Sequence, residues 1–328
     1  MTLRSTRRAA LAGLAAFVVA PRPVRAAVAP LRDLTLWGPP AGPSITVAHA
    51  AATGMLAAVA DKVTFKAWRN PDELRAGLTS GTLLASVMPT ASAANLFNRG
   101  LGVRLLNVMT DGLLHVIATD PGLDRIEKLK GRTIAVPFRN DTPEFALQRL
   151  LKTLDMAPGR DLTVETTGTP IEAIQMVAAG RIDAALVPEP AASAAIVRAA
   201  AMGKTVVRAM DFQAEWARLT GNSPDLPQAG MAVTDAFLKA HPEHVDLLHE
   251  ALATATAAVL AAPAVAAGSA AATLELPWPV IEKAIPHSRL VCTRAREARP
   301  SLERLFKTVA EYEPNVIGGR LPDAGFYL

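Results

Sequence analysis

The fold can be inferred from two stretches of sequence, Ile126-Glu-Lys-Leu-Lys-Gly131-Arg-Thr-Ile-Ala-Val136 and Ala178-Ala-Gly180-Arg-Ile-Asp183-Ala184-Ala. In the first stretch, a glycine turn leads into a buried strand at 132–136. In the second, a helix ends at Gly180 and a strand begins at Asp183, closed by Val187-Pro-Glu189-Pro190. Strands that are apolar on both faces and alternate with helices predict a parallel sheet covered by helices, an α/β fold.

Two helices outside these strands have clear start signals. Thr169-Pro170-Ile171-Glu172 is a capping box with proline at the first helical position. Further upstream, Asn70-Pro71-Asp72-Glu73 combines a cap residue, a proline and an acid. The upstream strands are expected at 34–37, 63–68, 83–88 and 103–109. They form a first α/β unit, and the part after residue 235 is expected to be almost wholly helical.

The chain is long enough for two lobes, because 328 residues exceed the size at which one hydrophobic core stops growing. Extended segments near Thr119 and near Gly230 are expected to cross between the lobes. The sequence therefore predicts lobe 1 at residues 27–118 and 231–328, and lobe 2 at residues 119–230. Two lobes joined by two crossings predict a hinge and an interlobe cleft.

Residues 1–26 have the layout of an export signal. Three arginines precede an apolar run at 9–20, and a short small-residue exit follows at 21–26. The run is shorter than the roughly 20 apolar residues that span a bilayer. Ser5-Thr6-Arg7-Arg8-Ala9-Ala10-Leu11 resembles a twin-arginine signal, although Ala10 stands at its aromatic position, so the general secretory route stays open. No cysteine lies near the exit, so no lipid anchor is expected.

The positive charge of the chain belongs to this segment. The whole sequence has 34 basic and 30 acidic residues, a formal charge of +4. Residues 1–26 contain five arginines and no acid, so the mature chain has 29 basic and 30 acidic residues, a charge of −1. A nucleic-acid partner therefore loses its main support. The single cysteine, Cys292, excludes an internal disulfide framework and a cysteine-rich zinc site.

The two quoted stretches and the capped helix between them resemble the solute-binding proteins of ABC importers for nitrate, sulfonate, taurine and thiamine-precursor pyrimidines. The resemblance is densest from about 126 to 196. It implies a two-lobed type II periplasmic binding fold that closes on a small molecule and presents it to a permease in the inner membrane. It also implies a monomeric, soluble periplasmic protein without cofactor or metal.

Candidate ligand-binding residues lie where predicted strands end, because ligands of open α/β sheets sit at the carboxyl ends of the strands, near helix N-termini. The expected set is Trp37, Gly38, Ser44, Thr90, Ser92, Thr110, Arg139, Asn140, Asp141, Thr142, Thr169 and Glu189. Structural roles stay open for some of them: core packing for Trp37, helix capping for Thr90 and Ser92, and a turn for Glu189. One residue of 140–142 must cap the following helix.

The ligand itself stays open, because the polar candidates point to different chemistry. Arg139 suits a carboxylate or sulfonate through bidentate hydrogen bonds. Asp141 and Glu189 instead suit an amine or a ring N–H. The loop Pro137-Phe138-Arg139-Asn140-Asp141 is also bulkier than the family's usual glycine or serine residues there. A sulfonate, nitrate, a carboxylate or a pyrimidine-like solute all remain candidates.

Catalytic motifs are not found. The sequence has no G-x-S-x-G, no P-loop and no G-x-G-x-x-G. The spacing of His241, His244 and His249 does not place all three on one helix face, so no metal site is expected. Cys292 is expected to be buried or inert. We therefore expect a receptor and not an enzyme; a menaquinone-type dehydratase on the same fold and a periplasmic ligand sensor are the alternatives.

Overall fold

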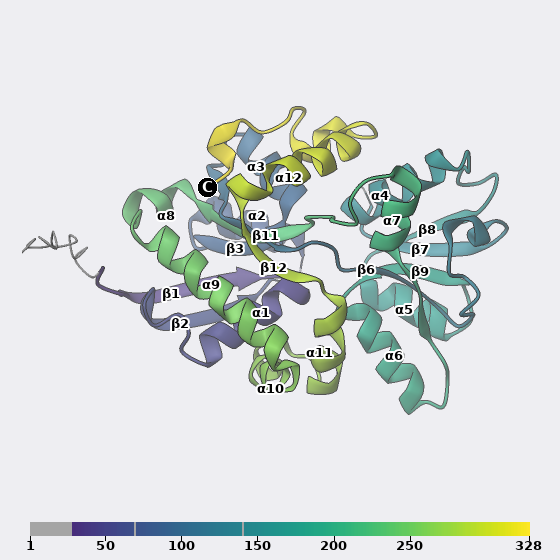
Figure 1. Cartoon of the computed structure of the whole chain (residues 1–328), viewed down its shortest axis with the longest axis horizontal. Helices are drawn as coiled ribbons and strands as arrows, with labels where there is room; N and C mark the ends of the chain where they lie inside the picture. The colour runs from purple at the N-terminus through teal and green to yellow at the C-terminus, as the bar shows by residue number, and fades with distance from the viewer. Residues whose placement is uncertain (1–27, 69, 140) are drawn as a thin grey trace, which may run out of the picture.

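The computed structural model describes residues 28–68, 70–139 and 141–328, which form two lobes, each built around its own sheet (Figure 1). The predicted signal at residues 1–26 and the candidate Asn140 lie outside the described residues. The two-lobed α/β fold expected from the sequence is confirmed.

The first sheet has seven strands in the order β12-β5-β11-β3-β1-β2, with β4 beside β11. Their bounds are β1 (Leu31–Gly38), β2 (Ala60–Ala67), β3 (Ala85–Pro89), β4 (Val103–Leu105), β5 (Asn107–Thr110), β11 (Ala229–Thr234) and β12 (Leu290–Arg294). Strand β1 is parallel to β2 and β3, whereas β11 is antiparallel to β3, β4 and β5. The sheet is therefore mixed and not parallel as predicted, because strands that return from the second lobe join it.

Helices cover both faces of this sheet. They are α1 (Gly42–Ala52), α2 (Pro71–Ser80), α3 (Thr90–Asn98), α8 (Asp235–Ala240), α9 (His244–Ala261), α10 (Pro263–Leu274), α11 (Trp278–Ala284) and α12 (Ala295–Ala310). Short 3-10 turns follow at η2 (Ile285–His287), η3 (Pro314–Ile317) and η4 (Ala324–Phe326). One core packs α1, α9 and α10 against the sheet, and a second core packs α3 and α12 against the opposite face.

The second sheet has five strands in the order β10-β6-β9-β7-β8. Its strands are β6 (Leu114–Ala118), β7 (Thr133–Pro137), β8 (Thr163–Thr167), β9 (Ala184–Pro188) and β10 (Val207–Asp211). Its helices are η1 (Ile126–Leu129), α4 (Thr142–Thr153), α5 (Pro170–Ala178), α6 (Ala191–Ala201) and α7 (Phe212–Thr220). The strands β7, β8 and β9 are mutually parallel where they pair, and β6 runs antiparallel to β9. Helices α4 and α7 share one core, and α5 and α6 share another.

The first crossing between the sheets differs from the predicted one. The segment 114–119 was expected to cross between the lobes, but β6 pairs with β9 and β10 inside the second sheet. The first crossing is therefore the short segment 111–113, and the second is 221–228, just before β11. We propose lobe boundaries at these two segments. The second differs little from the predicted boundary at 230.

The first crossing requires glycine at position 112. Gly112 has a φ of 133°, and a Cβ atom there would lie 2.3 Å from Cγ of Gln213. The Gln213 amide in turn holds β6, because its Oε1 accepts from the Leu114 N–H at 3.1 Å and its Nε2 donates to the Leu114 carbonyl at 3.1 Å. The close approach of Gln213 to the backbone thus fixes the chain where it enters the second lobe.

Helix α12 makes a third connection between the lobes. It starts beside β12 in the first lobe, but Leu305 and Val309 belong to the core that α4 and α7 form in the second lobe. Just after its end, Glu311 pairs with Arg149 of α4 at 3.1 Å. Residues near 305–311 thus pack on lobe 2, although the sequence prediction placed 231–328 in lobe 1.

The predicted helix starts are confirmed with one difference. The Asn70 side chain accepts hydrogen bonds from the N–H groups of Asp72 and Glu73, at 3.1 and 2.9 Å. Thr169 accepts from the Glu172 N–H at 3.2 Å, but the Glu172 carboxylate accepts from Gly168 and not from Thr169. Helix α1 ends at Ala52, and Gly54 just beyond it has a φ of 73°.

Within the described residues, no single helix is long and apolar enough to cross a membrane. Helices α9 and α10 together pass that test by length and composition, but the pair is bent by 117°.

Candidate ligand-binding cleft

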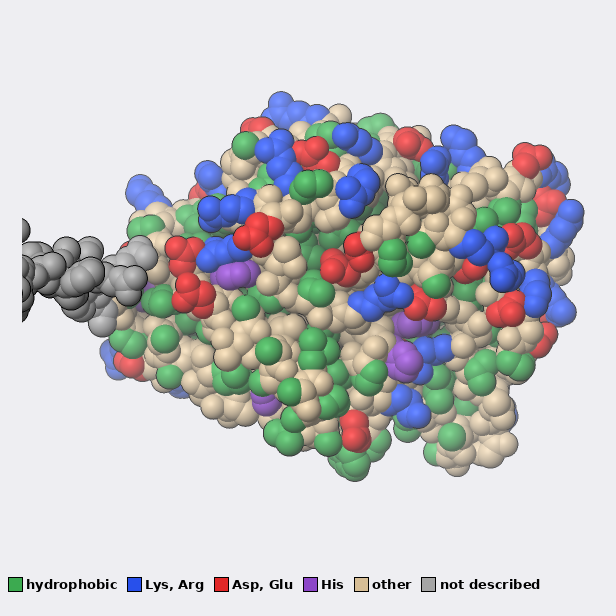
Figure 2. Space-filling view, viewed as in Figure 1, with side chains coloured by type: hydrophobic (Ala, Val, Ile, Leu, Met, Phe, Trp, Pro, Cys, Tyr) green, Lys and Arg blue, Asp and Glu red, His purple; other side chains and the backbone are tan. Residues whose placement is uncertain are grey.

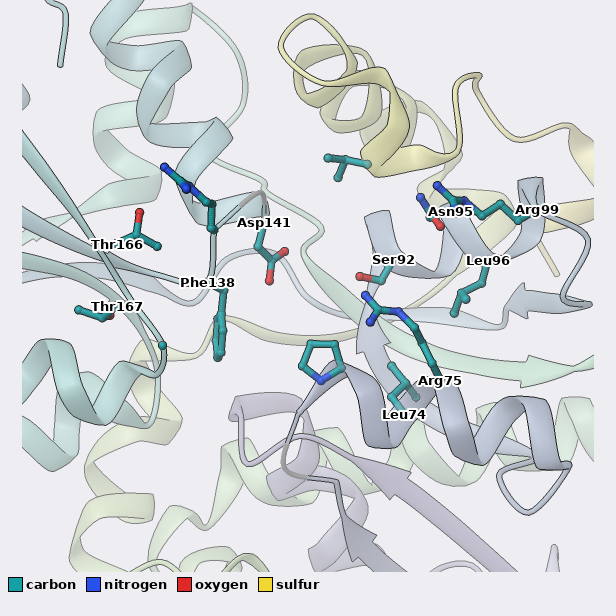
Figure 3. A pocket seen from close by; sticks show the side chains of 14 residues that line it. Leu74, Arg75, Ser92, Asn95, Leu96, Arg99, Phe138, Asp141, Thr166 and Thr167 are labelled. Atoms are coloured by element: carbon teal, nitrogen blue, oxygen red, sulfur yellow. The ribbon is translucent and has the colours of Figure 1, made fainter.

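A cavity of about 680 Å³ lies between the two lobes, and both lobes contribute to its walls (Figure 3). Helices α2 and α3, the residue that follows α3, and η3 form one side of the cavity. The end of β8 and the loops that follow β7 and β8 in lobe 2 form the other side. The lining residues are Pro71, Leu74, Arg75, Ser92, Asn95, Leu96, Arg99, Phe138, Arg139, Asp141, Thr166, Thr167, Gly168 and Val316. This volume falls within the usual range for small-molecule sites, roughly 300–1,000 Å³.

One face of α3 forms much of the wall in lobe 1. Ser92, Asn95, Leu96 and Arg99 are spaced three, four and seven residues apart, so they lie on the same side of the helix. Figure 3 shows the Arg75 and Ser92 side chains on this wall, with Phe138 and Asp141 across the cavity. The cavity therefore opens between side chains that move relative to each other when the lobes move.

The opposite wall is built where β7 and β8 end side by side. The two strands are parallel, with Pro137 opposite Thr167. Beyond this pair, the Phe138 N–H donates to the Thr167 carbonyl at 3.0 Å. The carboxyl ends of these two strands thus bring both loops to the cleft, as the strand-end rule predicts.

The Phe138 backbone is in a conformation that non-glycine residues rarely adopt. Its φ is 63°, in the left-handed region, and its side chain is half-buried in the cavity wall. Such a conformation costs on the order of 1–3 kcal/mol in a non-glycine residue, and it clusters at ligand sites. Phe138 lies in the loop that is bulkier than the glycine or serine residues usual in the family that the sequence resembles.

Among the described residues that line the cavity, three carry a guanidinium group and one carries a carboxyl group. Arg75 pairs with the exposed Asp72 at 2.6 Å, whereas Arg99 and Arg139 have no ion-pair partner among the described residues. Asp141 caps α4, because its Oδ1 accepts from the Thr142 N–H at 2.6 Å. Burial of the carboxyl group raises the pKa of Asp141, and the bond from Thr142 opposes this change. The lining is therefore positively charged overall.

The cavity brings together three of the predicted site residues, Ser92, Arg139 and Asp141. Asp141 also proves to be the cap that one residue of 140–142 had to supply. The other described candidates do not line the cavity: Trp37, Gly38, Ser44, Thr90, Thr110, Thr142, Thr169 and Glu189.

Two of these candidates hold the segments that connect the lobes. The Thr90 hydroxyl donates to the Pro227 carbonyl at 2.7 Å, and the Thr110 hydroxyl donates to the Ser288 carbonyl at 2.7 Å. Both side chains are buried, so their hydroxyls are already occupied. Thr169 caps α5.

Glu189 is fully buried in an ion pair with Arg208. The Arg208 Nε lies 2.6 Å from Oε1 of Glu189, and the Ser193 N–H donates to Oε2 at 3.1 Å. Burial raises the pKa of Glu189, while Arg208 and the bonds from Ser193 oppose this rise. In this conformation the Glu189 carboxylate stabilises the turn before α6. The Glu189 backbone carbonyl contacts the first lobe, where it accepts from the Gly42 N–H at 3.2 Å.

The end of β1 packs tightly against the start of α1. A Cβ atom at Gly38 would lie 2.4 Å from the Ser44 hydroxyl oxygen. Trp37 is half-buried against the core, with the Lys66 ammonium 5.5 Å from its ring centroid. The Ser44 and Thr142 hydroxyls are buried without a hydrogen-bond partner. These residues belong to strand and helix junctions around the cavity and not to its lining.

The strand-end rule missed Arg75 and Arg99. Arg75 lies in the second turn of α2, and Arg99 follows the last residue of α3, at the end of that helix farthest from β3. The spacing of 92, 95, 96 and 99 is the sequence signal that identifies this face of α3. The sequence does not show which face of the helix points to the other lobe.

Among the residues that the structure describes, no group of three or more histidine, cysteine, aspartate or glutamate side chains is arranged to hold a metal ion.

Several solved structures similar to this one are named as ABC transporter proteins or as periplasmic binding proteins. An ABC transporter protein from Parabacteroides distasonis superposes with a TM-score of 0.73 at 23% identity, covering 90% of this chain and 98% of its own. The periplasmic aliphatic sulphonate binding protein of Escherichia coli gives 0.68 at 15% identity, covering 89% and 92%. The periplasmic nitrate-binding protein of Synechocystis PCC 6803 gives 0.58 at 14% identity, covering 77% and 70%. At these identities the likeness shows the fold.

A search of curated proteins gave no match. The NMT1-like family, in contrast, matches residues 45–274, which span both lobes and most of the described chain. This match covers more than half of the chain, and the chain belongs to the NMT1-like family.

Proposed function

We propose that this protein is an exported receptor that captures a small solute between its lobes and delivers it to an ABC permease. The observation that carries the proposal is the cavity of about 680 Å³ with walls from both lobes. The proteins with similar folds support it, since two of them are named for binding sulphonate and nitrate.

The capture mechanism follows from the position of the cavity. A solute that contacts α3 on one side and the loops after β7 and β8 on the other makes all its contacts only when the lobes are close together. Its binding energy therefore favours the closed state, by the difference in affinity between closed and open forms. A permease that recognises the closed form then receives only loaded receptor.

Binding without chemical conversion suits the composition of the cavity. The described part of its lining contains arginine, serine, threonine and asparagine side chains, but no histidine or lysine. A hydroxyl nucleophile normally works with a neighbouring base of this kind. The single carboxyl group, Asp141, is engaged as a helix cap.

The partners and the location follow from the same proposal. Under this proposal, the predicted export signal at residues 1–26 directs the chain to the periplasm, and we propose that the mature protein is a soluble monomer there, without lipid anchor. Its macromolecular partner is an inner-membrane permease. With a mature charge of −1, attraction of an anionic solute comes from the local arginines and not from the net charge.

A thermal-shift screen of the mature protein tests the proposal. The screen includes sulfonates, nitrate, aliphatic and aromatic carboxylates, pyrimidines and their neutral analogues. A ligand at 100 times its dissociation constant stabilises the fold by about 2.7 kcal/mol. Each hit is then incubated with the protein and recovered, and we expect it to come back unchanged. Conversion of the hit into a product, or no hit from any class, contradicts the receptor function.

A further inference from the structure

The cavity between the lobes has an apolar part and a charged part. Pro71, Leu74, Leu96 and Val316 on the lobe 1 side, together with Phe138 from lobe 2, supply apolar surface. The Phe138 ring projects into the cavity from its loop (Figure 3). An aromatic ring on a cavity wall favours a flat apolar solute through offset stacking or edge-to-face contact.

The backbone at Phe138 strengthens this reading. With a φ of 63°, the position would suit glycine, and a glycine there would leave the cavity without its ring. A phenylalanine at this φ is strained, and Phe138 belongs to none of the hydrophobic core clusters of the described residues. If the receptor function holds, the strained Phe138 side chain is expected to contact the solute.

The charged part consists of Arg75 and Arg99 from lobe 1 and Arg139 from lobe 2. Arg99 and Arg139 have no ion-pair partner in the part of the chain that the structure describes, and the pair of Arg75 with Asp72 is exposed, with side-chain exposures of 62% and 90%. Such an exposed ion pair contributes little to stability, so an anionic ligand can replace Asp72 as the partner of Arg75. When the lobes close, guanidinium groups that lose water need an anion, because an unpaired buried charge is costly.

From these observations we propose that the cleft selects a flat aromatic solute that carries an anionic group, an aryl carboxylate or aryl sulfonate. This ligand class rests on the receptor function proposed above. A guanidinium group binds either acid through paired hydrogen bonds, and Phe138 contacts the ring.

The other candidate solutes fit less well. Nitrate fills a small part of a cavity of about 680 Å³ and offers no surface to Phe138. A neutral pyrimidine contacts the ring but leaves the arginines without a counter-charge. A short alkanesulfonate satisfies the arginines but not the flat apolar wall.

A matched series of probes tests the two parts separately. The probes are 2-naphthoate, naphthalene-2-sulfonate, the neutral 2-naphthamide, the saturated decahydro-2-naphthoate and nitrate, measured by calorimetry on the purified exported protein. We expect one or both aryl anions to bind about 10- to 100-fold tighter than 2-naphthamide, the effect of one charge-assisted hydrogen bond. We expect a loss of roughly 2- to 10-fold for the saturated acid. The two aryl anions distinguish carboxylate from sulfonate.

Four variants and one control assign these effects to residues. At least one arginine variant from each lobe, among Arg75→Gln, Arg99→Gln and Arg139→Gln, is expected to weaken the aryl anion about tenfold or more and to leave 2-naphthamide unchanged. Phe138→Leu is expected to weaken the binding of all three aromatic probes and to leave the binding of decahydro-2-naphthoate unchanged. Arg181→Gln is the control, because Arg181 is exposed and does not line the cavity.

The outcomes separate this inference from the proposed function. If nitrate or an alkanesulfonate binds and no aryl anion does, the ligand class is wrong and the receptor function stands. Equal affinity for 2-naphthoate and 2-naphthamide, or unchanged affinity in all three arginine variants, also overturns the ligand class. If the folded protein binds none of these probes and no solute of the wider screen, both proposals fail.

Discussion

Arg289 forms an ion pair with Asp211 across the lobes, with 2.9 Å between Nη2 and Oδ2. Arg289 lies just before β12 of the first sheet, and Asp211 ends β10 of the second. Next to this pair, the Asp111 N–H of the first crossing donates to the Arg289 carbonyl at 3.1 Å. Figure 2 shows histidine, arginine and acidic side chains gathered on this face, where the lobes meet. The hinge therefore contains several groups whose charge changes with pH.

We expect Asp111 to make stability depend on pH. Its burial and the nearby Asp225 raise the pKa of Asp111 to about 6, and Arg289 opposes this rise. Because the folded value exceeds the unfolded one, near 3.8, the stabilisation is complete below pH 4 and is lost as pH rises through 6. Asp111→Asn is therefore expected to gain up to about 3 kcal/mol relative to wild type between pH 4 and pH 7. Urea unfolding at several pH values measures this difference.

The contribution of His115 to stability changes with pH in the opposite direction, so the experiment must separate it from the contribution of Asp111. Burial lowers the pKa of His115 to about 4, with Arg208 and His287 also lowering it and Asp211 and the bond to the His287 carbonyl raising it. The stabilisation that comes from keeping His115 neutral is therefore lost as pH falls from about 6.5 through 4. The comparison with Asp111→Asn leaves His115 unchanged in both proteins. A flat stability difference from pH 4 to pH 7 contradicts the prediction for Asp111.

The ion pair between Glu189 and Arg208 is expected to be essential for folding stability. Glu189 is 0% exposed and Arg208 14% exposed, so a change to Glu189→Gln leaves a guanidinium group nearly buried without counter-charge. We expect a loss of about 3–5 kcal/mol in the free energy of unfolding. Urea denaturation of the variant and the wild type at pH 7 gives the value.

The matched control for this change is Lys128→Gln. Lys128 pairs with Asp124 at 2.7 Å, but both side chains are about half exposed, at 50% and 53%. Loss of such a pair is expected to cost no more than about 1 kcal/mol. Equal, small losses for the two variants would show that the Glu189 carboxylate is not needed for the fold and is free for another role.

Local chemistry explains which features the sequence could predict. The starts of α2 and α5 were predicted correctly, because the caps Asn70 and Thr169 act on backbone groups two or three residues away. The segment 114–118 was expected to cross between the lobes, because a strand that is apolar apart from His115 fits either sheet. Its pairing with β9 depends on residues about 70 positions away.

The same limit applies to the cleft. Arg139 and Asp141 were predicted, because the loop after a parallel strand lies at the binding edge of its sheet whatever the rest of the chain does. Arg75 and Arg99 line the cavity only because α2 and α3 of one lobe face the loops of the other. That arrangement is set by the crossings and by α12, which no local pattern describes.

Cys292 is expected to react slowly with alkylating agents. Burial raises the pKa of its thiol to about 12, with Arg294 and the bond from Asn107 opposing this rise. His249 lies close, with 3.8 Å between Sγ and Nδ1, but burial lowers the pKa of His249, so no imidazolium stabilises a thiolate near pH 7. Iodoacetamide at pH 8 should modify the folded protein at least about 100-fold more slowly than the protein unfolded in guanidinium chloride. Similar rates in the two states would show that Cys292 is activated.

Export is expected to remove the first 26 residues. The intact mass of protein from a periplasmic extract should match a chain that starts near residue 27 and lacks the five arginines of the signal. A double change of Arg7 and Arg8 to lysine is expected to retain the full-length precursor in the cytoplasm, if the twin-arginine route is used. Continued export of this variant assigns the protein to the general secretory route, and a full-length chain in the periplasm contradicts the cleavage.

Gly230→Ala is expected to destabilise the protein by disturbing β11, the strand with which the chain returns to the first sheet. Gly230 lies in β11, and a Cβ atom there would be 1.9 Å from the backbone carbonyl oxygen of Asn107 in β5. A backbone atom cannot move aside as a flexible side chain does, so β11 and β5 must separate. We expect a loss of about 3 kcal/mol or more in the free energy of unfolding, measured by urea denaturation, within the range of severe overpacking.

Gly268→Ala is the matched control, because Gly268 lies in α10 with no atom within 4 Å of the added Cβ. That change should stabilise the protein by about 1 kcal/mol through helix propensity, and a similar effect at both positions would contradict the close approach of β11 to β5.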